Sequence, residues 1–111
     1  MNDMKLWFGE MEEVAARRAC EGSSYLEFLR VPAMSVGLYA LKAGGQDPQT
    51  PHKQDEAYLV IEGRAHMRVA TEERKVTRGS FIFVAAGVEH RFFDIEEDLS
   101  VLVFFAPAES A

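Results

Sequence analysis

Short apolar runs separated by turn residues dominate the chain from Tyr25 onward. Eight of these runs have the length, the alternation and the β-branched and aromatic content of strands: residues 25–30, 34–42, 57–62, 65–70, 75–77, 80–84, 89–95 and 99–105. Turn residues separate them, and we read Gly63-Arg64 and Glu96-Glu97-Asp98 as two of the reversals. Eight evenly spaced strands with tight turns predict an all-β fold, either an antiparallel sandwich or a closed barrel.

The start of the chain follows a different pattern. Residues 9–19 are rich in Glu, Ala, Met and Arg, with Met11, Val14 and Arg18 at helical spacing, and they predict a short N-terminal helix. The turn at Gly22 ends that helix, and residues 25–107 form the predicted barrel. With no internal repeat or linker, the 111 residues are expected to form a single domain. Only the ends, residues 1–3 and 108–111, are expected to fray.

The predicted strand at residues 57–62 is apolar on both faces. Side chains alternate in direction along a strand, so Tyr58 and Val60 point the same way as Glu56. Leu59 and Ile61 point the other way and are also apolar. Such a strand needs cover on both sides, from a second layer of the same chain or from a second subunit.

Composition excludes several classes of partner. The net charge is −6 and the chain has no clustered excess of Lys and Arg, so we expect no nucleic-acid partner. The single cysteine, Cys20, cannot form an internal disulfide and is typical of a reducing compartment. No apolar run has the length of a signal peptide or of a membrane span, so we expect no membrane association and a cytoplasmic location.

Three residues carry the candidate chemistry: His52, Glu56 and His90. Two imidazoles and a carboxylate are ligands that a divalent transition metal prefers. On a straight strand His52 and Glu56 would lie about 13 Å apart, too far for one metal ion. The polar residues between them favour a bend that returns Glu56 to His52, and the metal hypothesis depends on that bend. Each residue alone would be read as a turn histidine or a solvated carboxylate.

The positions of these residues resemble the two motifs of the cupin superfamily, in particular its small single-domain microbial members. The matched positions are Gly44, His52, Glu56 and Gly63 in the first motif and Gly79, Gly87 and His90 in the second. The chain departs from the motifs at Thr50, where the family has its first histidine, and at Ala85 and Asp94, where it has proline and asparagine. The resemblance implies an antiparallel double-stranded β-helix, or jelly roll, and a homodimer.

The resemblance also implies a metal site, which family members with intact motifs build from three histidines and one glutamate. This chain offers His52, Glu56 and His90, and Gln49 or Asp47 could lend an oxygen in place of the missing imidazole. The expected cofactor is a divalent transition metal: iron, manganese, nickel or zinc. The alternative is a pocket that binds a small molecule without metal.

Three classes of function remain open from the sequence. The first is a metal-dependent dioxygenase, isomerase or lyase that acts on a small molecule, with Tyr58 close enough to transfer a proton. The second is a non-catalytic module that binds a small molecule. The third is a structural protein with a vestigial site. The sequence favours the first, because all three ligand residues are present.

Overall fold

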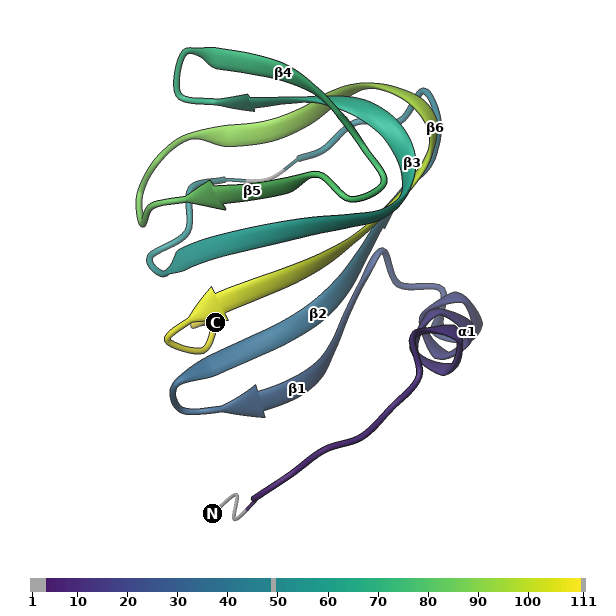
Figure 1. The fold of residues 1–111 in the computed structure, drawn as a ribbon, viewed down its shortest axis with the longest axis vertical. Coiled ribbons are helices and arrows are strands. Elements are labelled where there is room, and N and C mark those ends of the chain that lie inside the picture. Colours follow the sequence, from purple (N-terminus) through teal and green to yellow (C-terminus); the bar gives the residue numbers. More distant parts are fainter. Residues whose placement is uncertain (1–3, 49, 111) are drawn as a thin grey trace.

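The computed structural model describes residues 4–48 and 50–110 as one helix and six strands (Figure 1). These are α1 (Met11–Glu21), β1 (Tyr25–Val31), β2 (Met34–Leu41), β3 (Asp55–Val69), β4 (Glu72–Thr77), β5 (Phe81–Val84) and β6 (His90–Ala106). All pairings are antiparallel, in the order β1-β2-β6-β3-β4, with β5 also paired to β3. The sheet curls strongly, and α1 lies beside β1 and β2 (Figure 1). The predicted all-β fold with an N-terminal helix is confirmed.

Two of the predicted chain reversals are wrong, and the eight predicted strands are six. The chain does not turn at Gly63 or at residues 96–98, because β3 and β6 each run through these positions as one long strand. The pairing of β3 with β6 shifts register between Val60 and His66, so the strands bend through bulges instead of ending. Gly63 has φ 97°, and a Cβ atom there would lie 2.3 Å from the Asp98 carbonyl oxygen. Close approach of the two strands therefore requires this glycine.

The helix forms where it was expected, with its ends displaced by two residues from the predicted 9–19. It begins after Glu10 and ends at Gly22, which has φ 71° and donates its backbone N–H to the carbonyls of Arg18 and Ala19. Val14 packs with Leu26 and Leu38 in a small cluster that partly covers Ile61. Helix α1 therefore helps to bury the second face of β3, the face on which Ile61 lies.

The main core lies on the concave face of the sheet. It includes Tyr58, Val60, Phe92 and Val101, each at most 1% exposed. Glu56, Tyr58 and Val60 are all buried, as alternation along the strand predicted. Outside this core, Phe81 and Phe83 on β5 remain 65% and 60% exposed. Among the described residues, none of the helical segments combines the length and apolar character needed to cross a bilayer.

Candidate metal centre

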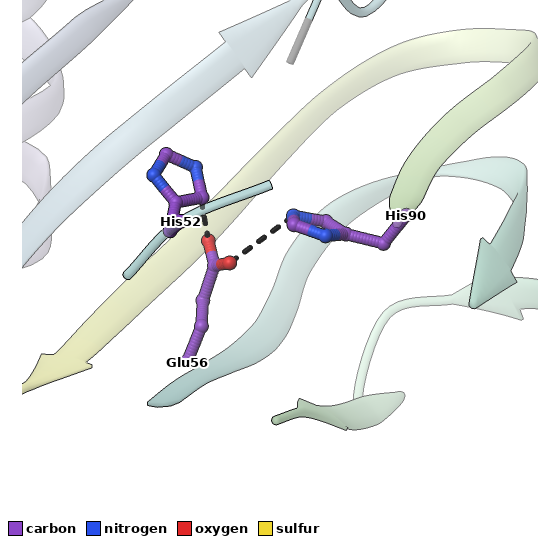
Figure 2. A group of neighbouring side chains, drawn as sticks. All are labelled: His52, Glu56 and His90. Atoms are coloured by element: carbon purple, nitrogen blue, oxygen red, sulfur yellow. Dashed lines mark ion pairs between the residues drawn. The ribbon is translucent and has the colours of Figure 1, made fainter. Parts of the chain in front are cut away.

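The structure brings His52, Glu56 and His90 together at one end of the barrel (Figure 2). His52 precedes β3, Glu56 is the second residue of β3, and His90 begins β6. One ligand atom from each residue lies within 4.8 Å of the other two. Glu56 Oε1 is 3.1 Å from His90 Nε2, and Glu56 Oε2 is 4.0 Å from His52 Nε2. These separations suit three ligands arranged around a single ion.

The bend predicted between His52 and Glu56 is present, and the turn before β6 holds it. The His52 carbonyl accepts a hydrogen bond from the Gly87 backbone N–H at 2.8 Å. The Asp55 carboxylate accepts another from the Ala86 backbone N–H at 2.9 Å. These two bonds join the first motif to the second. They hold the turn before His90 next to His52 and Glu56.

Glu56 is a buried carboxylate without a hydrogen-bond donor. The residue is 1% exposed, and neither carboxylate oxygen accepts a hydrogen bond from any residue that the structure describes. An ionised carboxylate in such a place loses several kcal/mol of hydration unless a nearby positive charge compensates. A divalent cation between Glu56 and the two imidazoles would supply that charge. The donor set and the unsatisfied carboxylate therefore both fit a transition metal.

The imidazole of His90 is held in the form that binds metal. Its Nδ1 lies 2.9 Å from the Val88 carbonyl oxygen, which can only accept, so Nδ1 carries the proton. Nε2 then presents its lone pair to the site, where the Tyr58 hydroxyl lies 3.0 Å away. Burial lowers the pKa of His90. The Glu56 carboxylate and the Val88 carbonyl raise this pKa by more than burial lowers it, so the net pKa lies above the ordinary value.

Of the two residues suggested as replacements for the missing histidine, only Asp47 can be compared with the cluster in the described part of the chain, and it does not belong to it. Gln49 lies outside the described residues. Both carboxylate oxygens of Asp47 have other partners: Oδ1 accepts from the Tyr39 hydroxyl at 2.6 Å and Oδ2 from the Phe92 backbone N–H at 2.9 Å. Thr50 is exposed.

A pocket of about 220 Å³ opens beside His52. It is lined by Tyr25, Tyr39, Pro48, His52, Val103, Phe105 and Glu109. The Phe105 ring meets the His52 ring edge-on, with centroids 4.9 Å apart. Within residues 4–48 and 50–110, the buried Tyr25 hydroxyl has no hydrogen-bond partner. The pocket thus has aromatic walls and the Tyr25 hydroxyl next to His52, which is a candidate metal ligand.

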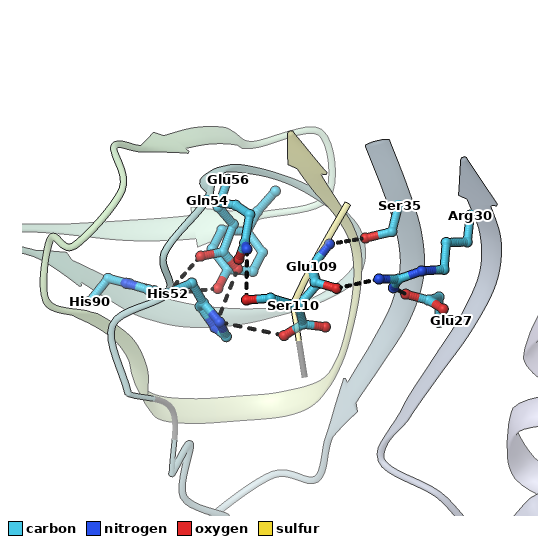
Figure 3. A network of polar contacts seen from close by, with 10 residues as sticks. Glu27, Arg30, Ser35, His52, Gln54, Glu56, His90, Glu109 and Ser110 are labelled. Carbon is cyan, nitrogen blue, oxygen red and sulfur yellow. Dashed lines mark hydrogen bonds and ion pairs between the residues drawn. The ribbon is translucent and has the colours of Figure 1, made fainter. Parts of the chain in front are cut away.

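Glu109 is a site residue that the sequence did not predict. Residues 108–111 were expected to fray, but Ala108, Glu109 and Ser110 are hydrogen-bonded to the barrel. Glu109 Oε2 lies 3.4 Å from His52 Nδ1 (Figure 3). No motif or periodicity marks this position, because the contact depends on how the tail folds back after Pro107.

Comparison with known proteins agrees with this architecture. The model of the cupin domain family matches residues 37–105, and the chain therefore belongs to that family. An uncharacterized protein of Streptomyces coelicolor, SCO3923, is 54% identical over 100 residues, which cover 90% of this chain and 95% of that protein.

Solved structures show the same fold. The protein TT1209 from Thermus thermophilus aligns with a TM-score of 0.78 and 26% identity, covering 93% of this chain and 99% of that chain. An RmlC-like cupin from Shewanella frigidimarina aligns with a TM-score of 0.68 and 19% identity, over 76% of this chain and 75% of the other. DMSP lyase DddQ from Ruegeria pomeroyi aligns with a TM-score of 0.64 and 19% identity, over 68% and 39%. The double-stranded β-helix expected from the motifs is confirmed.

Proposed function

We propose that this member of the cupin family is a metal-dependent enzyme that acts on a small molecule. The observation that carries the proposal is the Glu56 carboxylate, buried without a donor between two imidazoles. His52, Glu56 and His90 would hold the ion, and two nitrogens with one carboxylate oxygen suit iron, manganese, nickel or zinc. Three protein ligands leave coordination positions for substrate or water.

When bound, such an ion polarises a coordinated oxygen or lowers the pKa of coordinated water. The protein's own groups would orient the substrate and handle its protons. The pocket of about 220 Å³ beside His52 limits the ligand to a small molecule and offers aromatic walls for its apolar part. The Tyr58 hydroxyl, 3.0 Å from His90 Nε2, is placed to give or take a proton at the edge of the site.

The reaction class that we propose is a dioxygenase, isomerase or lyase reaction. One structural neighbour is named as a DMSP lyase, so lyase chemistry occurs on a similar fold in that protein. The second candidate function is a binding module without turnover. The largely apolar wall of the pocket favours it, because an apolar surface binds a ligand without needing a metal. A ligand that raises the unfolding temperature but is recovered unchanged would support the module.

The first experiment is to measure the metal content of untagged protein by plasma mass spectrometry, beside His90→Ala and His66→Ala variants. His66 is the matched control, because it stacks on Phe93 and is not one of the three clustered ligand residues. We expect near-stoichiometric iron, manganese, nickel or zinc in the parent and in His66→Ala, and little in His90→Ala. Absence of metal from the parent, even after reconstitution, would rule out the metal-dependent enzyme and leave the metal-free module.

We also propose that the chain forms a homodimer through exposed apolar side chains of residues 4–10 and of β5. In residues 4–10, which precede α1 (Figure 1), Leu6 and Phe8 are 71% and 89% exposed, while the Trp7 ring packs against Phe28 of β1 with centroids 5.3 Å apart. On β5, Phe81 and Phe83 are also exposed, and their paired neighbours Leu59 and Ala57 extend the apolar strip. The exposed apolar side chains of these two segments would cover one another if each segment packed on the other segment of a second copy.

Light scattering at micromolar concentration tests the dimer. The parent is expected to have the mass of two chains, and Phe83→Ser the mass of one. Arg74→Ser, a change at an exposed residue of neighbouring β4, is expected to leave the dimer intact. A parent with the mass of one chain would contradict the proposal.

A further inference from the structure

The end of the chain crosses the barrel beside the candidate metal centre and is anchored at each described residue after Pro107 (Figure 3). The Ala108 backbone N–H donates to the Pro32 carbonyl at 3.3 Å, and the Glu109 N–H donates to Ser35 Oγ at 2.9 Å. The Arg30 guanidinium donates to the Glu109 carbonyl at 2.7 Å. Gln54 Nε2 donates to Ser110 Oγ at 2.9 Å. These bonds fix the backbone from which the Glu109 side chain extends.

That side chain reaches the imidazole of His52. Glu109 Oε2 lies 3.4 Å from His52 Nδ1, while His52 Nε2 lies 4.0 Å from Glu56 Oε2. The two carboxylates therefore face opposite nitrogens of one ring. The Glu109 side chain is 28% exposed, so water only partly screens the contact.

His90 has the same arrangement with a different oxygen. Its Nδ1 is directed to the Val88 carbonyl, two residues earlier, and its Nε2 to the Glu56 carboxylate. In each of the two imidazoles, therefore, Nδ1 faces an oxygen acceptor and Nε2 faces the Glu56 carboxylate. For His90 the acceptor comes from the neighbouring backbone, and for His52 it comes from the far end of the chain.

We propose that Glu109 is a positioning residue for the metal centre. It keeps the proton of His52 on Nδ1 and turns Nε2 toward Glu56 and His90. The inference rests on the proposed metal site and adds a residue of this chain to it. An acceptor behind a ligating imidazole fixes the ring and increases its basicity, and its loss typically lowers metal affinity about 10- to 100-fold.

The test measures the Zn²⁺ dissociation constant of the untagged full chain by competition with a chromophoric chelator. Glu109→Ala is expected to bind about 10- to 100-fold more weakly than the parent. Glu109→Gln, whose amide oxygen can still accept from Nδ1, is expected to recover most of the affinity. Ser35→Ala removes the acceptor of the Glu109 N–H but keeps the Arg30 contact to its carbonyl and the carboxylate itself, so it is expected to lose less affinity than Glu109→Ala. Glu73→Ala removes the same charge from exposed β4 and should match the parent.

Long-range ¹H–¹⁵N spectra of the histidine rings supply a readout that a merely structural role would not change. In the metal-free parent, His52 is expected to carry its proton on Nδ1 and to present the lone pair of Nε2 to the site. In Glu109→Ala we expect that single form to be lost, while the His90 signals stay as in the parent. If Glu109→Ala fails to fold, the same spectra of Ser35→Ala and Glu109→Gln carry the test.

Three results would overturn the inference. Unchanged affinity and an unchanged His52 ring form in Glu109→Ala would remove the role of Glu109 and leave the metal site intact. Equal weakening in Glu73→Ala would mean that only overall charge matters. A parent that does not bind Zn²⁺, iron, manganese or nickel would remove the proposed function and this role with it.

Discussion

Two buried carboxylates in this barrel, Asp47 and Glu56, have opposite surroundings. Asp47 is 6% exposed and accepts hydrogen bonds on both oxygens, from the Tyr39 hydroxyl and the Phe92 backbone N–H. Glu56 is 1% exposed and accepts no hydrogen bond in the described part of the chain. The carboxylate of Asp47 is therefore hydrogen-bonded on both oxygens, whereas the carboxylate of Glu56 faces two imidazoles.

The difference separates a carboxylate that holds two parts of the fold together from one whose surroundings suit a cation. Asp47 attaches the segment between β2 and β3, at the start of the first motif, to β2 and β6, since Tyr39 and Phe92 lie on those strands. Burial raises the pKa of Tyr39, and the hydrogen bond to Asp47 raises it further, so the phenol remains a donor. Glu56 has no such donors, and its buried charge is compensated only when a cation, or a protonated His90, is beside it.

The largest expected effect comes from removing the charge of Glu56. Glu56→Gln is expected to weaken metal binding at least about 1,000-fold, or about 4 kcal/mol, because the only carboxylate among the three ligands is lost. The metal-free variant should unfold at the same temperature as the metal-free parent or higher, because an uncompensated buried charge has been removed. Chelator competition and thermal unfolding in EDTA measure the two quantities. A metal-free variant less stable than the parent would mean that Glu56 is structural, like Asp47.

The converse experiment is on Asp47. Asp47→Ala leaves the Tyr39 hydroxyl and the Phe92 N–H buried without their acceptor, which costs about 3 kcal/mol of unfolding free energy. For a chain of this size we expect the unfolding midpoint to fall by about 10 °C. The folded fraction should still bind metal with an affinity close to that of the parent. If affinity fell with no loss of stability, Asp47 would belong to the metal site.

The sequence predicted the parts of the molecule that depend on local pattern. The strands and the helix follow from periodicity, and His52, Glu56 and His90 from their spacing. The local sequence predicts a reversal at Gly63, because a bulge in a long bent strand has the same local sequence as a turn. A glycine is required there because the Asp98 carbonyl lies close to it, and Asp98 belongs to another strand, β6.

The roles of Asp47 and Glu109 escaped sequence reasoning for the same reason. Their partners, Phe92 and His52, are brought to them only by tertiary folding. In sequence, Asp47 looked like a spare oxygen donor and Glu109 like part of a frayed end. A carboxylate's function depends on which donors surround it, and that information is not local.

The pH dependence should have opposite signs for stability and for metal binding. The folded-state pKa of His90 is raised. Its contribution to the stability of the metal-free protein is therefore fully present below the unfolded pKa of about 6.5 and is lost as pH rises through the folded value. Metal binding requires neutral His90 and should weaken about tenfold per pH unit below that raised pKa.

Thermal unfolding in EDTA and chelator competition, both between pH 5 and pH 8, measure these two trends. His90→Gln should abolish the part of the stability change that comes from the imidazole, because the glutamine side chain does not titrate. Metal affinity that stays constant between pH 7 and pH 5 would show that the histidines are not ligands.

The smallest expected effect comes from completing the ligand set. Thr50 occupies the position of the first motif histidine and is exposed, so a larger side chain there meets no packed core. Thr50→His places a further imidazole donor on the segment that carries His52, and we expect metal affinity to rise about fivefold, or about 1 kcal/mol. Thr50→Asn, which is polar but a poor ligand for these metals, is the control. Because Glu56 already provides the charge, a neutral donor should add less than the carboxylate does. A gain comparable with the loss in Glu56→Gln would mean that coordination number, and not the buried charge of Glu56, determines affinity at this centre.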